Sequence, residues 1–134
     1  DPVARAEVLE ALADVLRDER RSVLFSSHNT HDVEQLADHI AFLHDGRLVA
    51  HADKESFLDN WRRVLCLGEL PPAVSNWTEV AQVRHAGSQV EVKVRLWRED
   101  LPQRLAAQGL QVQRIDPMAL DDIFVTAVRA GGAV

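Results

Sequence analysis

A histidine that follows a short apolar run is the residue of this sequence best suited to chemistry. Val23–Phe25 predicts a buried strand of a parallel sheet, and Ser26-Ser27-His28 ends that run. Open α/β sheets bind their ligands at the carboxyl ends of the strands. An imidazole at such a place can donate a hydrogen bond to a phosphate oxygen. We therefore expect His28 to face a ligand.

The residues after His28 predict a helix and then a hairpin. Asn29 or Thr30 can cap the helix, because both side chains accept hydrogen bonds from backbone amides. Its apolar face would consist of Val33, Leu36 and Ala37. Asp45-Gly46 is typical of a tight turn, and the strands on either side of it would contain Ile40, Phe42 and Leu43, then Leu48 and Val49.

These residues together resemble a known family. The triplet Ser26-Ser27-His28, followed by Glu34, Asp38 and the run IAFLHDGRLV, resembles the switch-histidine region of the ATP-binding subunits of ABC transporters. Asp1-Pro2, with Arg5 after it, resembles the loop that follows the Walker B strand of that family. The rest of the chain resembles, less closely, the C-terminal extension of exporter-type members.

The resemblance implies roles for two residues. His28 would reach the γ-phosphate of ATP and orient the attacking water, and Asp1 would lie in the loop that crosses between two ATP-binding subunits. It also implies ATP and Mg²⁺ as cofactors of the intact protein. The partners would be a second ATP-binding subunit and a transmembrane permease, with the subunit held in the cytoplasm at the inner face of the membrane. The implied function is the coupling of ATP binding and hydrolysis to export.

The chain does not contain the rest of the nucleotide site. A Gly-rich phosphate loop of the form G-x-x-x-x-G-K-[S/T] occurs nowhere in it, nor does an LSGGQ-like signature or a Walker B strand. We therefore predict that the chain alone binds no cofactor and hydrolyses no ATP. Because it starts at Asp1 without Met, we also expect it to be the C-terminal piece of a longer protein.

Other sites are weaker candidates. A metal site would have to use His28, His31, His39, His44 and His51, which fall on different predicted elements and lack the cysteines of a closed zinc site. Asp121-Asp122 are adjacent on a predicted helix and point about 100° apart, so they cannot act together on one substrate. The tryptophans are expected to be core or interface anchors: Trp61, Trp77 and Trp97. No metal site is expected.

Composition excludes several classes of protein. The net charge of −6 and the lack of a basic cluster argue against nucleic-acid binding. A single cysteine, Cys66, excludes a disulfide framework and predicts a buried thiol. No stretch reaches the roughly 20 apolar residues of a membrane span.

The predicted fold is α/β with two domains. The pattern of residues 1–61 predicts the order helix, strand, helix, β-hairpin, helix. The resemblance implies that these residues are part of a P-loop-type ATPase core with the switch histidine. Residues 62–134 would be a small α+β accessory domain in the order β-β-β-α-β-α. In this second part Val90, Val92, Val94 and Leu96 alternate, which predicts a strand with one buried face.

The sequence also allows a second function. The chain could be a free-standing regulatory or self-association module without nucleotide chemistry, and its second half could modulate subunit dimerisation. The strand predicted at Val23–Phe25 would leave an unpaired edge, so we expect copies of the chain to self-associate.

Overall fold

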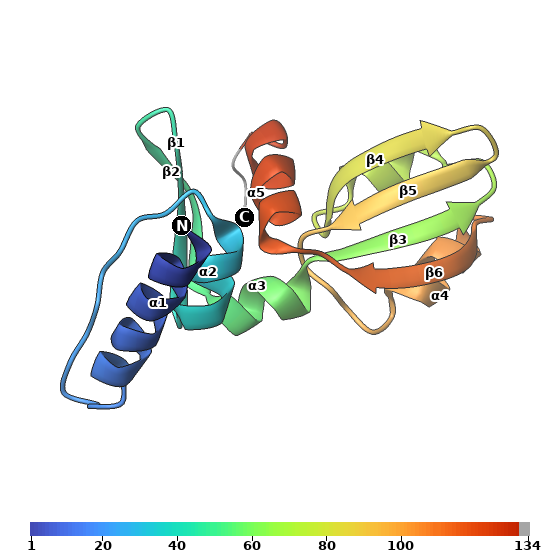
Figure 1. Cartoon of the computed structure of the whole chain (residues 1–134). Coiled ribbons are helices and arrows are strands. Elements are labelled where there is room, and N and C mark those ends of the chain that lie inside the picture. Colours follow the sequence, from blue (N-terminus) through green and yellow to red (C-terminus); the bar gives the residue numbers. More distant parts are fainter. Residues whose placement is uncertain (132–134) are drawn as a thin grey trace. The chain divides into compact units, whose positions relative to one another are not determined.

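The computed structural model describes residues 1–131 and divides the chain into two compact units. The first unit contains residues 1–38, and the second begins at His39. Figure 1 labels the helices and strands. The elements are mixed α and β, as the sequence predicts. The sequence predicts a boundary between an ATPase core and an accessory domain at residue 61. The division into compact units does not test that boundary, so it stays a prediction.

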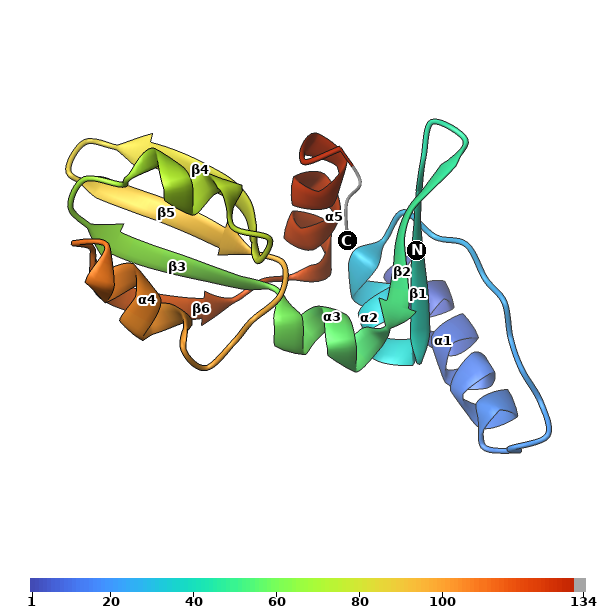
Figure 2. The same ribbon diagram turned by 180° about the vertical axis from the view of Figure 1, so that it is seen from behind.

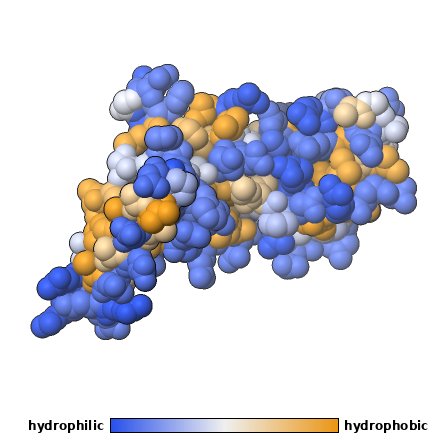
Figure 3. Space-filling model, viewed as in Figure 1, coloured by the Kyte–Doolittle hydropathy of each residue, from blue (hydrophilic) through white to orange (hydrophobic). Residues whose placement is uncertain are grey.

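The first unit consists of helices and an extended segment. Helix α1 covers Pro2–Leu16 and α2 covers Thr30–Leu36, and the two helices contact each other. No residue of α1 is fully buried, and Val3 and Val8 are 66% and 58% exposed. Figure 3 shows this apolar surface in orange over α1. A helix in each of these two places was expected from the sequence.

The second unit starts with the predicted hairpin. Strand β1, His39–His44, pairs with β2, Arg47–Asp53, around Asp45 and Gly46. Both turn residues have positive φ, 50° and 73°. A two-residue type I′ turn requires this, and Asp-Gly is one of the pairs that it favours. Helix α3, Lys54–Asn60, follows directly. Its cap is the Asp53 carboxylate, which accepts hydrogen bonds from the amide and hydroxyl of Ser56 at 3.1 and 2.6 Å.

The remaining strands form one antiparallel sheet. Its strands are β3 (Arg62–Leu67), β4 (Val80–Ala86), β5 (Gln89–Val94) and β6 (Gln111–Pro117), in the order β4-β5-β3-β6. Its helices are the short 3-10 helix η1 (Pro72–Asn76), α4 (Leu101–Ala107) and α5 (Leu120–Arg129). The order β-β-β-α-β-α is confirmed. The sequence missed η1. Strand β5 ends at Val94, so Leu96, which continues the predicted alternation, lies outside it, because no residue of a neighbouring strand pairs beyond Val94.

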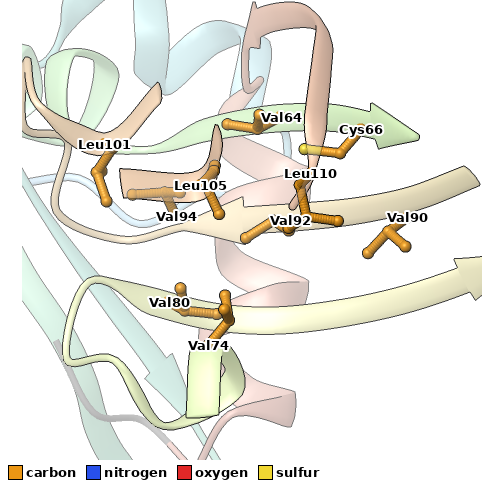
Figure 4. Close-up of a cluster of buried hydrophobic side chains, with 10 residues drawn as sticks. All are labelled: Val64, Cys66, Val74, Val80, Val90, Val92, Val94, Leu101, Leu105 and Leu110. Carbon is orange, nitrogen blue, oxygen red and sulfur yellow. The ribbon is translucent and has the colours of Figure 1, made fainter. Parts of the chain in front are cut away.

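The hydrophobic core lies on one face of this sheet. Figure 2 shows η1 and α4 on the same side of the strands, and Figure 4 shows the side chains between them. The cluster contains Val64, Cys66, Val74, Val80, Val90, Val92, Val94, Leu101, Leu105 and Leu110. Burial raises the pKa of the Cys66 thiol, which keeps it protonated and inert. The predicted alternation of β5 therefore places its valines in the core.

Both outer strands of the sheet contain an irregularity. In β4, Val80 pairs with Val94 and Gln82 with Lys93, so Ala81 is an extra residue. In β6, Val112 pairs with Cys66 and Arg114 with Leu65, so Gln113 is extra. These are β-bulges, which bend a strand and increase its twist.

A buried carboxylate ties β4 to α4. Glu79, just before β4, is 6% exposed, and its Oε2 lies 3.1 Å from Nη1 of Arg104. Thr78 donates a hydrogen bond to Oε1 at 3.2 Å, and the Arg104 guanidinium lies 4.4 Å from the ring centroid of Trp77. Burial raises the pKa of Glu79, but the hydrogen bonds from Arg104 and Thr78 and the positive charges of Arg104 and Arg98 together lower it by more. The net pKa therefore lies below its ordinary value.

Removing this charge is expected to destabilise the sheet in a pH-dependent way. Because the folded-state pKa of Glu79 is lowered, its ionised form stabilises the protein above the ordinary pKa of 4.5, and this contribution is lost as pH falls through the folded-state pKa. Glu79→Gln should lower the free energy of unfolding by about 2 kcal/mol at pH 7. Urea titrations should show that the difference in the free energy of unfolding between the unchanged protein and Glu79→Gln becomes smaller below pH 4.5. Glu69→Gln, at an exposed position, is the control, and an equal loss for both variants would contradict the expectation.

Candidate functional site

The segment before His28 is extended but is not a strand. Residues 21–27 have no regular secondary structure, and the first unit, residues 1–38, contains no strand with which they could pair. Leu24 is fully exposed, at 101%, while Val23 and Phe25 are partly buried. The prediction of a buried strand at Val23–Phe25 is therefore wrong for the described residues. A strand needs neighbours to satisfy its backbone hydrogen bonds, and the local apolar run cannot supply them.

His28 lies in a bend two residues before α2 begins at Thr30. The Ser27 hydroxyl accepts a hydrogen bond from the Asn29 amide at 2.9 Å, and the Asn29 side chain accepts one from the Asp32 amide at 3.2 Å. Asn29 is thus the helix cap, one of the two that the sequence allows. These local bonds fix the backbone on both sides of His28. Its side chain is exposed, so the ring can reach a ligand.

Asp1 caps α1. Its Oδ1 accepts a hydrogen bond from the Val3 amide at 3.0 Å, and Pro2 occupies the first helical position. The carboxylate is exposed, so this capping role and contact with another subunit are compatible. Asp1 and His28 both belong to the first unit, and no hydrogen bond or ion pair joins them within the described residues.

An ion pair that the sequence did not predict connects the two helices of the first unit. Nε of Arg5 lies 3.7 Å from Oδ2 of Asp32, whose side chain is only 13% exposed. Asp32 is the acidic residue in the first turn of α2, four residues after His28. The ion pair therefore links the start of α1 to the helix that follows the histidine.

The alternative sites do not form clusters. Within residues 1–131 no group of three or more His, Cys, Asp or Glu side chains could hold a metal ion. His31 contacts Gln35 at 3.2 Å, and His44 lies 3.4 Å from Asp45. Asp122, one of the adjacent acids, pairs with Arg63 at 2.9 Å. Each of these side chains thus contacts a different neighbour, and the three contacts do not form a common site.

Two surface grooves within the described residues are lined by residues of the second unit. One groove of about 420 Å³ lies beside β4 and η1, and another of about 550 Å³ lies between the hairpin and the end of α5. Neither is lined by Asp1 or His28. None of the helices within the described residues has the length and apolar content to cross a bilayer. Asp1 and His28 are both exposed residues of the first unit.

Comparison with known proteins gives partial matches. No protein family model matches the chain. The thiamine import ATP-binding protein ThiQ of Rhizobium meliloti (strain 1021) is 40% identical over 58 residues, which are 43% of this chain and 24% of that protein. ThiQ of Chelativorans sp. (strain BNC1) is 29% identical over 76 residues, 57% of this chain and 28% of that protein.

A third relative matches along almost the whole chain. An uncharacterized ABC transporter ATP-binding protein of Synechocystis sp. (strain ATCC 27184 / PCC 6803 / Kazusa) is 30% identical over 138 aligned positions, 98% of this chain and 38% of that protein. The chain thus spans between 24% and 38% of the length of these relatives. Two of them are named for import, so they do not support the exporter type. By sequence, this chain is homologous to the ATP-binding proteins of ABC transporters.

Proposed function

We propose that this chain forms part of the ATP-binding subunit of an ABC transporter and helps to couple ATP binding and hydrolysis to transport. The homology with a named ATP-binding protein across 98% of the chain carries this proposal. The relatives named for import remove the reason to assign export, and we assign no direction. The intact protein would use ATP and Mg²⁺, would pair with a second ATP-binding subunit and would bind a transmembrane permease at the inner face of the membrane.

Within this function, His28 is the residue that would reach the γ-phosphate. Its exposure and the capped turn that holds its backbone support the role, because a donor must be accessible and preorganised to stabilise phosphoryl transfer. Asp1 would lie at the contact with the second subunit. The exposed Leu24 and the unpaired segment around it support association of this segment with further strands or with another copy.

The test uses the product of the complete reading frame that contains residues 1–134. That frame should also encode a G-x-x-x-x-G-K-[S/T] loop, and the purified product should hydrolyse ATP. His28→Ala should lower the turnover number about 100-fold, because one preorganised donor to the reacting phosphate is lost. His31→Ala is the matched control, since His31 is an exposed histidine three positions away, on α2.

Two outcomes would contradict the proposal. A complete protein without ATP hydrolysis would remove the function, and equal activity of the two histidine variants would remove the role of His28. The 134-residue chain should show no ATP turnover, because its sequence supplies no phosphate loop. Turnover that survives repeated purification of this chain would refute that prediction.

A further inference from the structure

Among the described strands, the hairpin at the start of the second unit joins no larger sheet. Strands β1 and β2 pair only with each other among the described strands. A two-stranded hairpin is at best marginally stable in water, so it needs packing against other elements. Its buried residues are Ile40, Phe42 and Ala50. The elements that cover Phe42 therefore determine whether the hairpin stays folded.

Two phenylalanines cover Phe42. The ring of Phe42 in β1 has its centroid 5.1 Å from that of Phe57 in α3 and 5.1 Å from that of Phe124 in α5, both with interplanar angles of 43°. Phe124 also meets the His44 ring edge-on at 6.2 Å. We call Phe42, Phe57 and Phe124 the aromatic clasp. Such pairs add about 0.5–1.5 kcal/mol each beyond the burial of their area.

Helix α5 also belongs to the four-stranded sheet. It follows β6 after only two residues, and its buried side consists of Leu120, Ile123, Thr126 and Ala127. Nη2 of Arg63, in the central strand β3, lies 2.9 Å from Oδ2 of Asp122 in α5. The helix contacts β2, α3 and β4, and Figures 1 and 2 both show it between the hairpin and the sheet. One helix thus contacts both parts.

We propose that α5 is a conformational coupling element, through which the state of the C-terminal sheet controls the order of the β1–β2 hairpin. Displacement of α5 from the sheet withdraws Phe124 from the aromatic clasp and leaves the hairpin without half of its aromatic cover. A partner that binds the sheet and shifts α5 would then loosen the hairpin. The coupling rests on contacts within the second unit and does not depend on nucleotide chemistry.

Hydrogen exchange of the 134-residue chain tests the clasp. Phe124→Ala should speed exchange of the β1–β2 amides by at least about tenfold, while β3 and β5 amides change by less than about twofold. Val125→Ala is the control, because Val125 is the next residue of α5 and is 43% exposed. Equal acceleration in hairpin and sheet, or none in the hairpin, would overturn the proposal. If Phe124→Ala does not yield soluble protein, Phe124→Leu is judged by the same comparison.

A second pair of variants tests transmission from the sheet. Arg63→Met removes the ion pair with α5 and should speed exchange in the hairpin about two- to threefold. Lys93→Met is the matched control. Lys93 lies opposite Arg63 in the register, and both contact Glu91, but only Arg63 pairs with α5. Equal hairpin exchange in the two variants would refute the coupling. Since no nucleotide is present, this failure would leave the proposed transport function untouched.

Discussion

Val92→Asp is expected to unfold the C-terminal sheet. Val92 is 0% exposed in the central part of the core and lies between Val64 and Val83 on the neighbouring strands. An aspartate there would be a buried carboxylate without a partner. Leaving a buried charge unpaired costs about 3–5 kcal/mol, and the total stability of a small domain is only about 5–15 kcal/mol. Circular dichroism on heating should therefore show the loss of the cooperative transition.

Gln89→Asp provides the control for this variant. Gln89 lies in the same strand, β5, but is exposed, so the new charge remains solvated and the free energy of unfolding should change by less than about 0.5 kcal/mol. A cooperative transition of Val92→Asp close to that of the unchanged protein would show that the two faces of the sheet are assigned the wrong way round.

Leu105→Ala should lower the free energy of unfolding by about 3 kcal/mol. Leu105 is 1% exposed and packs from α4 onto the sheet as part of the hydrophobic core. Truncation removes apolar contact and leaves a cavity that the short helix cannot fully close. Urea unfolding followed by tryptophan fluorescence measures the change, with Gln103→Ala on the exposed side of α4 as the control. A loss no larger than that of the control would mean that α4 does not cover the core.

The parts of the fold that depend on neighbouring residues could be predicted from the sequence. Asp45-Gly46 specifies a turn because its backbone angles are accessible to these two residues, and the valines of β5 alternate because a strand has a period of two. Helix α5 follows from its apolar spacing. In each case the pattern and its physical cause lie within a few residues of each other.

The parts that depend on distant residues could not be predicted. The apolar run Val23–Phe25 has the composition of a strand, but pairing requires partner strands that the described residues do not supply to it. The Glu79–Arg104 pair joins residues 25 positions apart, and the contact of Phe124 with Phe42 joins opposite ends of the second unit. Nothing in the local sequence indicates which acid meets which base or which ring meets which ring.

The same division applies to the candidate site. The cap at Asn29 follows from its type and its place before an apolar helix, and the structure forms it. The ion pair between Arg5 and Asp32 joins two helices, and nothing in the sequence near either residue predicts it. The role of His28 was suggested by family resemblance, since a lone histidine in a polar triplet does not by itself identify its ligand.

The extra residues Ala81 and Gln113 have a consequence for how copies of this protein can meet. A foreign strand can extend a sheet only where it finds a regular row of free amides and carbonyls, and a bulge interrupts that row and turns it aside. Pro117 removes one further donor from β6. We therefore expect the sheet to stop at four strands in solution and to resist fibre-like stacking. Residues 21–27 contain no bulge of this kind. A charged substitution there is therefore the change that should most reduce association between copies.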